Sequence, residues 1–276
     1  MSAATSTRQS VSSTAQSFLD QISTKAVSKP TAAVVFGPPG IGKTEFGAAF
    51  PGCVFWPTED GVNTLKTYGR IGAEIPVLPQ PDTWDDVLAI LREFQSSAHK
   101  YKALIVDTFG GIETLCHKHV CNQHYNGDWG EKGFQGYQRG YETSLPEWRL
   151  FLNELDNVRT KGMSVVLLGH SEIKPFKSPV TEDYDRYVPA VHHKTWKLTH
   201  RWADMVIFYN YHIVIDDSGN RAKGKGGNSR ILNTEFCAAF EAKNRHGLPA
   251  EIDAGDSGEE AYKNLIEAIK ESKGAN

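Results

Sequence analysis

A glycine-rich segment near the start of the chain constrains the fold more than any other part of the sequence. Residues 37–44 fit the pattern GxxxxGK[ST], and they directly follow the apolar run at 32–36, which is typical of a buried parallel strand. Glycines at this spacing allow backbone N–H groups to face a polyphosphate, and a helix that begins behind them adds positive potential. The segment therefore predicts a strand, a phosphate-binding loop and a helix in succession. We expect the nucleotide contacts to come from Gly37, Pro38, Pro39, Gly40, Ile41, Gly42, Lys43 and Thr44.

Such a loop needs a cation for the phosphates and ligands for a metal ion. Lys43 is expected to reach the β- and γ-phosphates, and the Thr44 hydroxyl to bind Mg²⁺. Asp107 ends the apolar run 104–106, so it is expected to hold the same Mg²⁺ through water; alone, an Asp at this position would also suit a helix cap. The guanine-selecting pattern Asn-Lys-x-Asp is absent from the sequence, which favours ATP as the nucleotide.

Hydrolysis also requires a group that orients water near the γ-phosphate. Glu59 lies just beyond the apolar run 53–56, where a strand beside the first one would bring its carboxylate to the rim of the site. His170 ends another apolar run, at the sheet edge where ligands bind in open α/β sheets, and is expected to sense the γ-phosphate. The alternatives are that Glu59 caps a helix and that His170 is a structural histidine.

The composition is that of a folded protein with a sizeable core. Of 276 residues, 39% are hydrophobic and 23% are charged, which excludes a disordered polyelectrolyte. No run of about 18 apolar residues is present, so no membrane partner is expected, and the N-terminus lacks an apolar secretory core. The formal net charge of −3 excludes a globally basic nucleic-acid binder but leaves room for a local basic patch. The 4 cysteines favour a reducing cytoplasm over a disulfide scaffold.

Apolar runs alternate with amphipathic stretches along most of the chain. This alternation predicts an α/β domain with a largely parallel sheet and an antiparallel C-terminal extension. We expect one domain over 30–276, with its core at about 31–250 and a closing helix at 258–272, preceded by a flexible arm at 1–29. The predicted strands are 32–36, 53–56, 75–78, 103–106, 163–168, 205–215, 231–234 and 237–241, and the predicted helices are 82–97, 146–160 and 259–270.

Taken in order, these motifs resemble those of the RecA-like core ATPases. The series consists of the phosphate loop, Glu59 after the next strand, Asp107, His170 and a late segment at 243–245. The resemblance covers about residues 31–250 and is strongest to phage-encoded RecA-like ATPases that act in single-strand annealing and recombination. It implies a RecA-like P-loop NTPase core with helices on both faces of a mostly parallel sheet. It also implies that Lys243 and Arg245 of one subunit reach the nucleotide of its neighbour; a solvated strand end is the alternative.

This sequence departs from the bacterial recombinase at two points. His170 stands where that enzyme has a glutamine, which leaves the coupling of DNA to ATP open. The chain also leaves no room for a separate C-terminal DNA-binding domain, so a minimal core is expected.

In RecA-like proteins two loops grip single-stranded DNA at the axis of the oligomer, and the resemblance places them at 116–140 and 171–201 here. A third stretch, 219–230, is rich in glycine and basic residues and ends on Arg230; we expect a basic hairpin tip there. Cations interleaved with aromatic rings suit a single strand, because phosphates meet cations while bases stack. Solvated loops or a protein-binding surface remain the alternative. The candidate DNA contacts are Lys132, Arg139, Lys174, Lys177, Lys194, Trp196, Lys197, Arg221, Lys223 and Lys225.

Five cysteines and histidines lie close together in one short stretch and suggest a second kind of site, for a metal ion. The side chains are Cys116, His117, His119, Cys121 and His124. Zinc favours such ligands, but their spacing fits no familiar zinc knuckle and no second Cys or His pair lies nearby in the sequence. Metal binding at this stretch is therefore left open.

The residues and the resemblance together predict an Mg²⁺-dependent ATPase that binds single-stranded DNA and assembles with itself as a ring or filament. Turnover is expected to be stimulated by assembly and by DNA. A phage single-strand binding protein is a further candidate partner, and the host cytoplasm is the expected location. Three alternatives remain: a helicase or packaging motor, an ATP-locked oligomer that anneals or protects DNA without turnover, and a loader that binds a replication protein.

Overall fold

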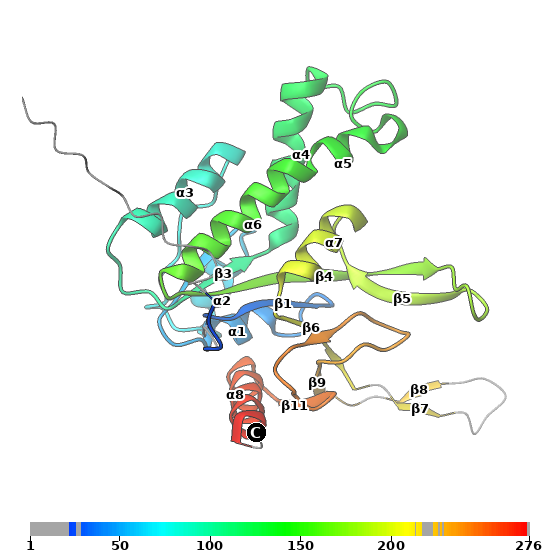
Figure 1. Cartoon of the computed structure of the whole chain (residues 1–276). Helices are drawn as coiled ribbons and strands as arrows, with labels where there is room; N and C mark the ends of the chain where they lie inside the picture. The colour runs from blue at the N-terminus through cyan, green and yellow to red at the C-terminus, as the bar shows by residue number, and fades with distance from the viewer. Residues whose placement is uncertain are drawn as a thin grey trace, which may run out of the picture.

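The computed structural model describes residues 22–25, 29–212, 214–216, 223–225, 227 and 229–274. The strands of its main sheet are β1 (Ala32–Gly37), β2 (Cys53–Pro57), β3 (Ala103–Asp107), β4 (Ser164–Phe176), β5 (Tyr184–Pro189), β6 (Met205–Tyr211), β9 (Arg230–Asn233), β10 (Lys243–Asn244) and β11 (Glu251–Gly255). Their main path runs in the order β11-β9-β6-β1-β4-β3-β2, with β10 beside β6 and β5 beside β4 (Figure 1). The strands from β6 to β2 pair in parallel, whereas β9, β10 and β11 join antiparallel. Two further strands, β7 (Val214–Asp216) and β8 (Lys223–Lys225), pair only with each other.

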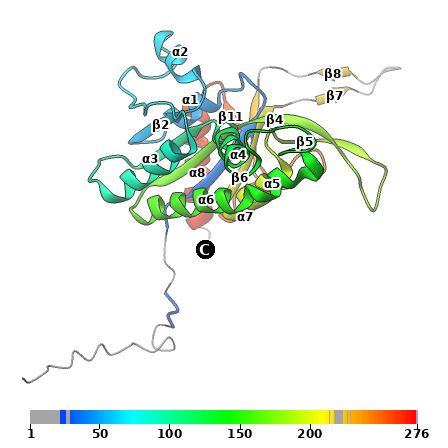
Figure 2. The same ribbon diagram turned by 90° about the horizontal axis from the view of Figure 1, so that it is seen from above.

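Helices cover both faces of the sheet (Figure 2). One face carries α3 (Trp84–Ser96), α4 (Phe109–Tyr125), α6 (Leu145–Thr160) and α7 (His193–Trp202), and the other carries α1 (Lys43–Ala48), α2 (Gly61–Thr67) and α8 (Gly258–Gly274). The short turn η2 (Gly136–Gln138) and the helix α5 (Arg139–Thr143) lie between α4 and α6 in the chain. Along β1, Val34 and Phe36 pack in the core on the face that carries α3, α4, α6 and α7. Ala33 and Val35 pack in the core on the face that carries α1, α2 and α8. Burial on both faces explains why the central strands are continuous apolar runs.

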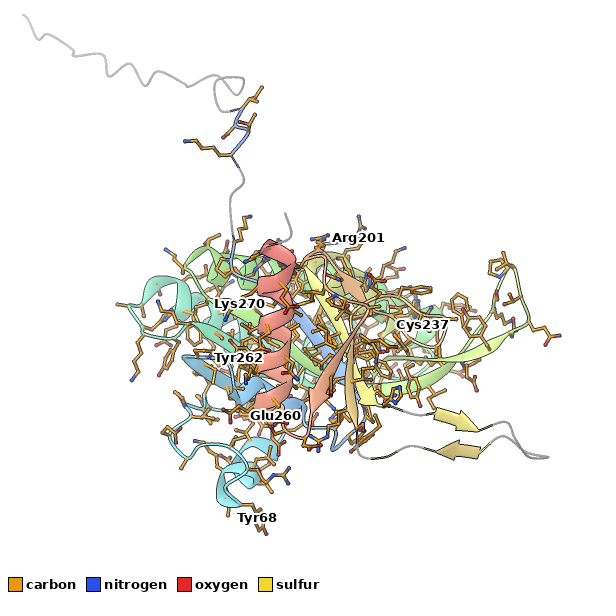
Figure 3. The ribbon with its side chains drawn as sticks, turned by 90° about the horizontal axis from the view of Figure 1, so that it is seen from below. Tyr68, Arg201, Cys237, Glu260, Tyr262 and Lys270 are labelled. Atoms are coloured by element: carbon orange, nitrogen blue, oxygen red, sulfur yellow. The ribbon has the colours of Figure 1, made fainter. Side chains whose placement is uncertain are left out.

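The strongest periodic segments form the helices that were expected. Residues 82–97, 146–160 and 259–270 correspond to α3, α6 and α8. Thr83 caps α3, since its hydroxyl accepts from the Asp86 amide while the Asp86 carboxylate accepts from the Thr83 amide. On the opposite face, α8 packs against α1, and its Tyr262 ring lies 4.6 Å from that of Phe50 (Figure 3).

Two of the predicted strands are wrong. Residues 75–78 run beside β2 and exchange two backbone hydrogen bonds with Phe55, but Pro76 has no N–H to donate and only one bridge, from Phe55 to Val77, forms. Residues 237–241 turn back on themselves through a bridge between Cys237 and Phe240. The predicted strand 205–215 is divided, because β6 ends at Tyr211 and β7 pairs with β8 instead.

The two stretches expected as DNA-gripping loops contain regular structure instead. In the first, α4 continues to Tyr125 before the chain turns through η2. In the second, β4 runs on past His170 and pairs antiparallel with β5 from Ser171 to Phe176, and α7 follows. This β4–β5 hairpin projects from the body of the molecule (Figures 1 and 2). The resemblance predicted where these stretches lie in the sequence but not their backbone conformation.

The architecture is therefore the expected α/β fold, with a mostly parallel sheet, helices on both faces and antiparallel C-terminal strands. In the part of the chain that the structure describes, no helix has the length and apolarity needed to cross a membrane. The predicted N-terminal arm at 1–29 lies largely outside the described residues.

Candidate active site

The phosphate loop joins β1 to α1 at the carboxyl edge of the parallel strands. Gly40 (φ 77°) and Gly42 (φ 108°) adopt left-handed conformations that glycine takes without strain. Ile41, between them, is fully buried and anchors the loop to the core. Gly37 is required for a different reason, because a Cβ there would lie 2.0 Å from the carbonyl oxygen of Tyr209 on the adjacent strand. The shape of the loop thus depends on glycine at separate positions.

Lys43 lies beneath this loop. Its Nζ donates to the carbonyl oxygens of Gly37 and Pro38, at 2.9 Å each. The side chain is only 6% exposed, and burial lowers the pKa of Lys43 to about 8 against the opposing influence of Asp107 and Glu59. A buried cation below a loop that begins a helix is suited to an incoming polyphosphate.

Asp107 and Thr44 form the part of the site that fits a magnesium ion. Asp107 ends β3 opposite Leu168 of β4 and Pro57 of β2. The Thr44 hydroxyl donates to Asp107 Oδ2 at 2.7 Å. Burial raises the pKa of Asp107, opposed by this hydrogen bond and by the charge of Lys43. A hydroxyl and a carboxylate brought together from two elements are oxygen ligands of the kind that Mg²⁺ takes.

Glu59 follows β2 and is held by two neighbours. Its Oε1 accepts from the Thr108 hydroxyl at 2.8 Å, and its Oε2 lies 3.4 Å from Nε2 of His170 at the end of the buried part of β4. Thr58 fixes the backbone beside it, because its hydroxyl donates to the Thr108 carbonyl oxygen and accepts from the Thr108 amide. The Glu59 side chain is 53% exposed, so these contacts, rather than packing, set its direction.

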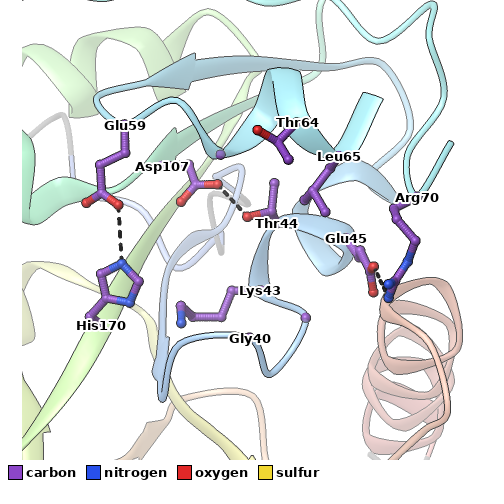
Figure 4. A pocket seen from close by; sticks show the side chains of 12 residues that line it. Gly40, Lys43, Thr44, Glu45, Glu59, Thr64, Leu65, Arg70, Asp107 and His170 are labelled. Carbon is purple, nitrogen blue, oxygen red and sulfur yellow. Dashed lines mark hydrogen bonds and ion pairs between the residues drawn. The ribbon is translucent and has the colours of Figure 1, made fainter. Parts of the chain in front are cut away.

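These side chains line a cavity of about 430 Å³ (Figure 4). Lys43, Thr44 and Asp107 lie in its middle, and Glu59 with His170 lies at one end. At the other end, Arg70 pairs with Glu45 at 2.6 Å. Five residues around this cavity were not predicted from the sequence. Glu45 could have been found because it follows Thr44 on the same helix, but no motif marks Gly61, Thr64, Leu65 or Arg70.

Lys243 and Arg245 do not line the cavity of their own protomer. They lie on and just after β10, which pairs with the beginning of β6, at the edge of the sheet opposite the phosphate loop. Lys243 Nζ donates to the carbonyl oxygens of His200 (2.7 Å) and Ala203 (2.6 Å) at the end of α7. Arg245 is more exposed and pairs with Asp204 at 3.2 Å.

Asp204 itself has further partners. Its Oδ2 accepts from Arg159 at 2.5 Å and from the Ala32 amide at 3.1 Å, while Arg245 approaches Oδ1. The carboxylate therefore joins the start of β1, the end of α6 and the segment after β10.

The candidate DNA contacts are spread over three elements. Lys132 and Arg139 are exposed between α4 and α6. Lys174 and Lys177 lie on the β4–β5 hairpin, where Lys174 pairs with Glu172 at 2.7 Å. Lys194 and Lys197 lie on α7, where Lys194 pairs with Glu142 at 2.6 Å and Lys197 is exposed.

Trp196 is a correction to the predicted DNA surface. Its side chain is 7% exposed, packs 6.0 Å from the ring of Phe36 and donates its indole N–H to Glu241. Because α7 is amphipathic, the aromatic residue faces the core and the neighbouring lysines face solvent. Trp196 therefore has no face free for a base. Arg221 lies outside the described residues, and of Lys223 and Lys225 only the backbone, in β8, is described.

The cysteines and histidines at 116–124 are not gathered into a metal site. They follow one another along α4, where Cys116, His117 and Cys121 are buried. Burial lowers the pKa of His117 to about 4 and raises that of the Cys116 thiol, so both are uncharged at neutral pH. Over the described ranges, the structure holds no group of three or more His, Cys, Asp or Glu side chains that could bind a metal ion.

The chain is similar to a known protein family and to solved structures. The RadB recombinase is 13% identical, with 83% of this chain and 90% of that chain covered and a TM-score of 0.44. A KaiC-like protein from the hyperthermophilic archaeon Pyrococcus horikoshii OT3 is 14% identical, with coverage of 82% and 85% and a TM-score of 0.41. The sequence matches none of the curated proteins with which it was compared. Residues 29–246, most of the chain, match the family described as AAA domain. The chain therefore belongs to the AAA-domain family of P-loop ATPases.

Proposed function

We propose that this chain is an Mg²⁺-dependent ATPase that assembles with copies of itself and acts on single-stranded DNA, in recombination or annealing of the phage type. The observation that carries the proposal is the convergence of Lys43, Thr44, Asp107 and Glu59 on one cavity, although they come from three separate parts of the chain. This grouping supplies a cation, metal ligands and a carboxylate next to a phosphate-binding loop.

Each of these side chains has a part in the proposed reaction. Lys43 binds the β- and γ-phosphates, and its buried position makes this contact stronger than it would be in water. Thr44 and Asp107 hold Mg²⁺, which draws negative charge from the phosphates. Glu59 accepts a proton from the attacking water, and the Thr108 hydroxyl keeps the carboxylate directed at that water. His170 reports the presence of the γ-phosphate through its contact with Glu59.

A neighbouring copy is proposed to complete the site. Arg245 is 54% exposed and has one carboxylate partner, so it is the group best able to reach the nucleotide of another subunit. Lys243 is tied to the end of α7 and supports the segment that presents Arg245. Hydrolysis then depends on assembly, because each nucleotide lies between two protomers.

The decisive measurement is ATP turnover with and without single-stranded DNA, with the mass of the particle determined in parallel. We expect Mg²⁺-dependent turnover that rises with assembly and with DNA. Glu59→Gln should bind ATP but not hydrolyse it, whereas Glu93→Gln, which changes an exposed carboxylate on α3, should leave turnover unchanged. Failure of the unmodified protein to bind adenine nucleotide with magnesium present would overturn the proposal. Binding without turnover, even with DNA, would select the ATP-locked oligomer instead.

The DNA part of the proposal has its own test on the β4–β5 hairpin. Lys174→Ala combined with Lys177→Ala removes two cations from the projecting hairpin. We expect the slope of log affinity for single-stranded DNA against log salt to fall by about 1 to 2. The matched control, Lys270→Ala with Lys273→Ala, removes two exposed lysines from α8 and should leave the slope unchanged. Equal slopes for all three proteins would remove the hairpin from the DNA surface.

A further inference from the structure

Arg230 lies in an unexpected place. The sequence suggested a basic hairpin tip, but Arg230 begins β9, opposite Tyr211 of β6 and Gly255 of β11. Its guanidinium reaches back to the phosphate loop. The position that a Cβ of Gly42 would occupy lies 3.0 Å from Arg230 Nη1 and 3.4 Å from the hydroxyl of Tyr209. A cation and a hydroxyl from two strands thus pack directly against the loop.

Two guanidinium nitrogens and the hydroxyl of this pair lack a hydrogen-bond partner within the described part of the chain. Nε and Nη1 of Arg230 and the hydroxyl of Tyr209 are buried and have no hydrogen-bond partner there. The Glu45 carboxylate, whose Oε2 lies 3.5 Å from the position of a Gly42 Cβ, is paired with Arg70 through Oε1. Burial raises the pKa of Tyr209, so its hydroxyl stays a neutral donor across the physiological range. Buried donors left unpaired are unfavourable, and a guanidinium more so than a neutral group. An anion in the loop would satisfy them.

The topology of the sheet indicates which part of the anion they would meet. In the sheet, β1 lies between β6 and β4. Asp107 and His170 approach the loop from the β4 side, together with Glu59, and this is the side of the metal ion and the attacking water. Arg230 and Tyr209 approach from the β6 side. The γ-phosphate belongs with the first group, so the second group lies toward the rest of the phosphate chain.

We propose that Arg230, assisted by the Tyr209 hydroxyl, binds the α- and β-phosphates of the nucleotide from within the same protomer. This inference rests on the proposed function, since it needs a nucleotide in the phosphate loop. It adds to Lys43 a second cation in cis, supplied by a strand almost 190 positions later in the chain. Guanidinium groups suit this task because their planar donors match phosphate oxygens.

The test measures binding and stability, not turnover. Arg230→Met keeps most of the side-chain length and removes the donors and the charge. We expect its dissociation constants for Mg·ADP and Mg·ATP to rise equally, by about tenfold or more. Inorganic tripolyphosphate, which has no base or sugar, should show the same loss. Without nucleotide, the melting temperature of the variant should be unchanged or raised, because Nε and Nη1 form no hydrogen bond within the described residues. Tyr209→Phe should weaken binding of the same ligands by a smaller factor.

Two controls and three outcomes separate the possibilities. Arg149→Met removes an exposed arginine from α6 and should change neither quantity, whereas Lys43→Ala should abolish binding. Unchanged affinity together with a lower melting temperature would make Arg230 a structural brace for Gly42 and overturn the inference alone. Weaker binding of ATP but not of ADP would overturn the assignment to the α- and β-phosphates. If the unmodified protein binds none of these ligands, the proposed function fails as well.

Discussion

Thr108 directly follows Asp107, the proposed magnesium ligand, and its hydroxyl donates to one oxygen of Glu59. Thr108→Val keeps the shape of this nearly buried side chain but removes the donor. We expect kcat for ATP hydrolysis to fall about tenfold or more, while nucleotide affinity changes little, because the base loses its direction and the phosphate contacts remain. Steady-state kinetics with a separate binding titration will separate the two effects.

The conservative and control variants make this prediction specific. Thr108→Ser retains a hydroxyl and should recover most of the lost turnover. Thr114→Val removes a nearby hydroxyl that donates to the Gly110 carbonyl oxygen and not to Glu59, so it should behave like the unmodified protein. A Thr108→Val protein with unaltered kcat would show that Glu59 needs no such hydrogen bond.

The pKa of Lys43, about 8 in the free protein, predicts a pH dependence of nucleotide binding. A bound triphosphate stabilises the ammonium and raises this pKa, so above pH 8 the complex holds more protons than the free protein. Affinity for Mg·ATP should therefore be flat below about pH 8 and fall by up to about tenfold per pH unit above it. Lys43→Arg, which stays charged, should bind with no such decline. Titrations across this range would contradict the prediction if the unmodified protein showed constant affinity.

At the scale of elements, Lys243 connects β10 to the end of α7. Its ammonium donates to carbonyl oxygens that the helix leaves unpaired. Lys243→Met should lower the free energy of unfolding by about 1–2 kcal/mol, as expected for charged hydrogen bonds at a helix C-terminus. Arg245→Ala loses one exposed ion pair and should cost less than about 1 kcal/mol. Urea unfolding of both variants tests the difference; equal losses would show that the Lys243 contacts do not stabilise α7.

The elements that could be predicted are those whose burial follows one regular pattern along their length. The strand at 32–36 is apolar throughout because both of its faces are covered, and α3 repeats apolar residues with helical spacing and carries its own cap at Thr83. The predictions fail where contacts with distant parts of the chain determine the secondary structure. The apolar stretch at 75–78 lies at the sheet edge but contains Pro76, and β4 extends past His170 only because β5 pairs with it. The sequence of one strand carries no information about which other strand will pair with it.

The site was predictable to the same extent. Lys43 and Thr44 were found because a spacing rule links residue type to phosphate chemistry, and Asp107 because it ends an apolar strand; the structure brings all three to one cavity. Arg70 and Arg230 follow no such rule. Arg70 reaches Glu45 of α1 from the segment after α2, and Arg230 reaches Gly42 from β9, so both contacts exist only in the folded chain.

At the scale of the whole molecule, the proposed reaction involves two copies of the chain. Lys43→Ala lacks a working loop but keeps Arg245, and Arg245→Ala has the reverse defect. Each protein alone should be inactive, whereas an equal mixture should regain about a quarter of full turnover, because a quarter of random interfaces combine the two intact parts. Turnover of the mixture, measured at a concentration that supports assembly, tests this expectation. Mixtures that remain inactive, with assembly verified by mass, would place the catalytic arginine elsewhere.

The carboxylate of Asp204 would keep hydrogen-bond donors if Arg245, one of its three partners, moved away. If Arg245 turns outward to a neighbouring copy, Oδ2 still receives Arg159 and the amide of Ala32. The protomer thus keeps both of these internal contacts whether it is alone or assembled. Subunits built in this way could join and part within every catalytic round while each of them stays folded.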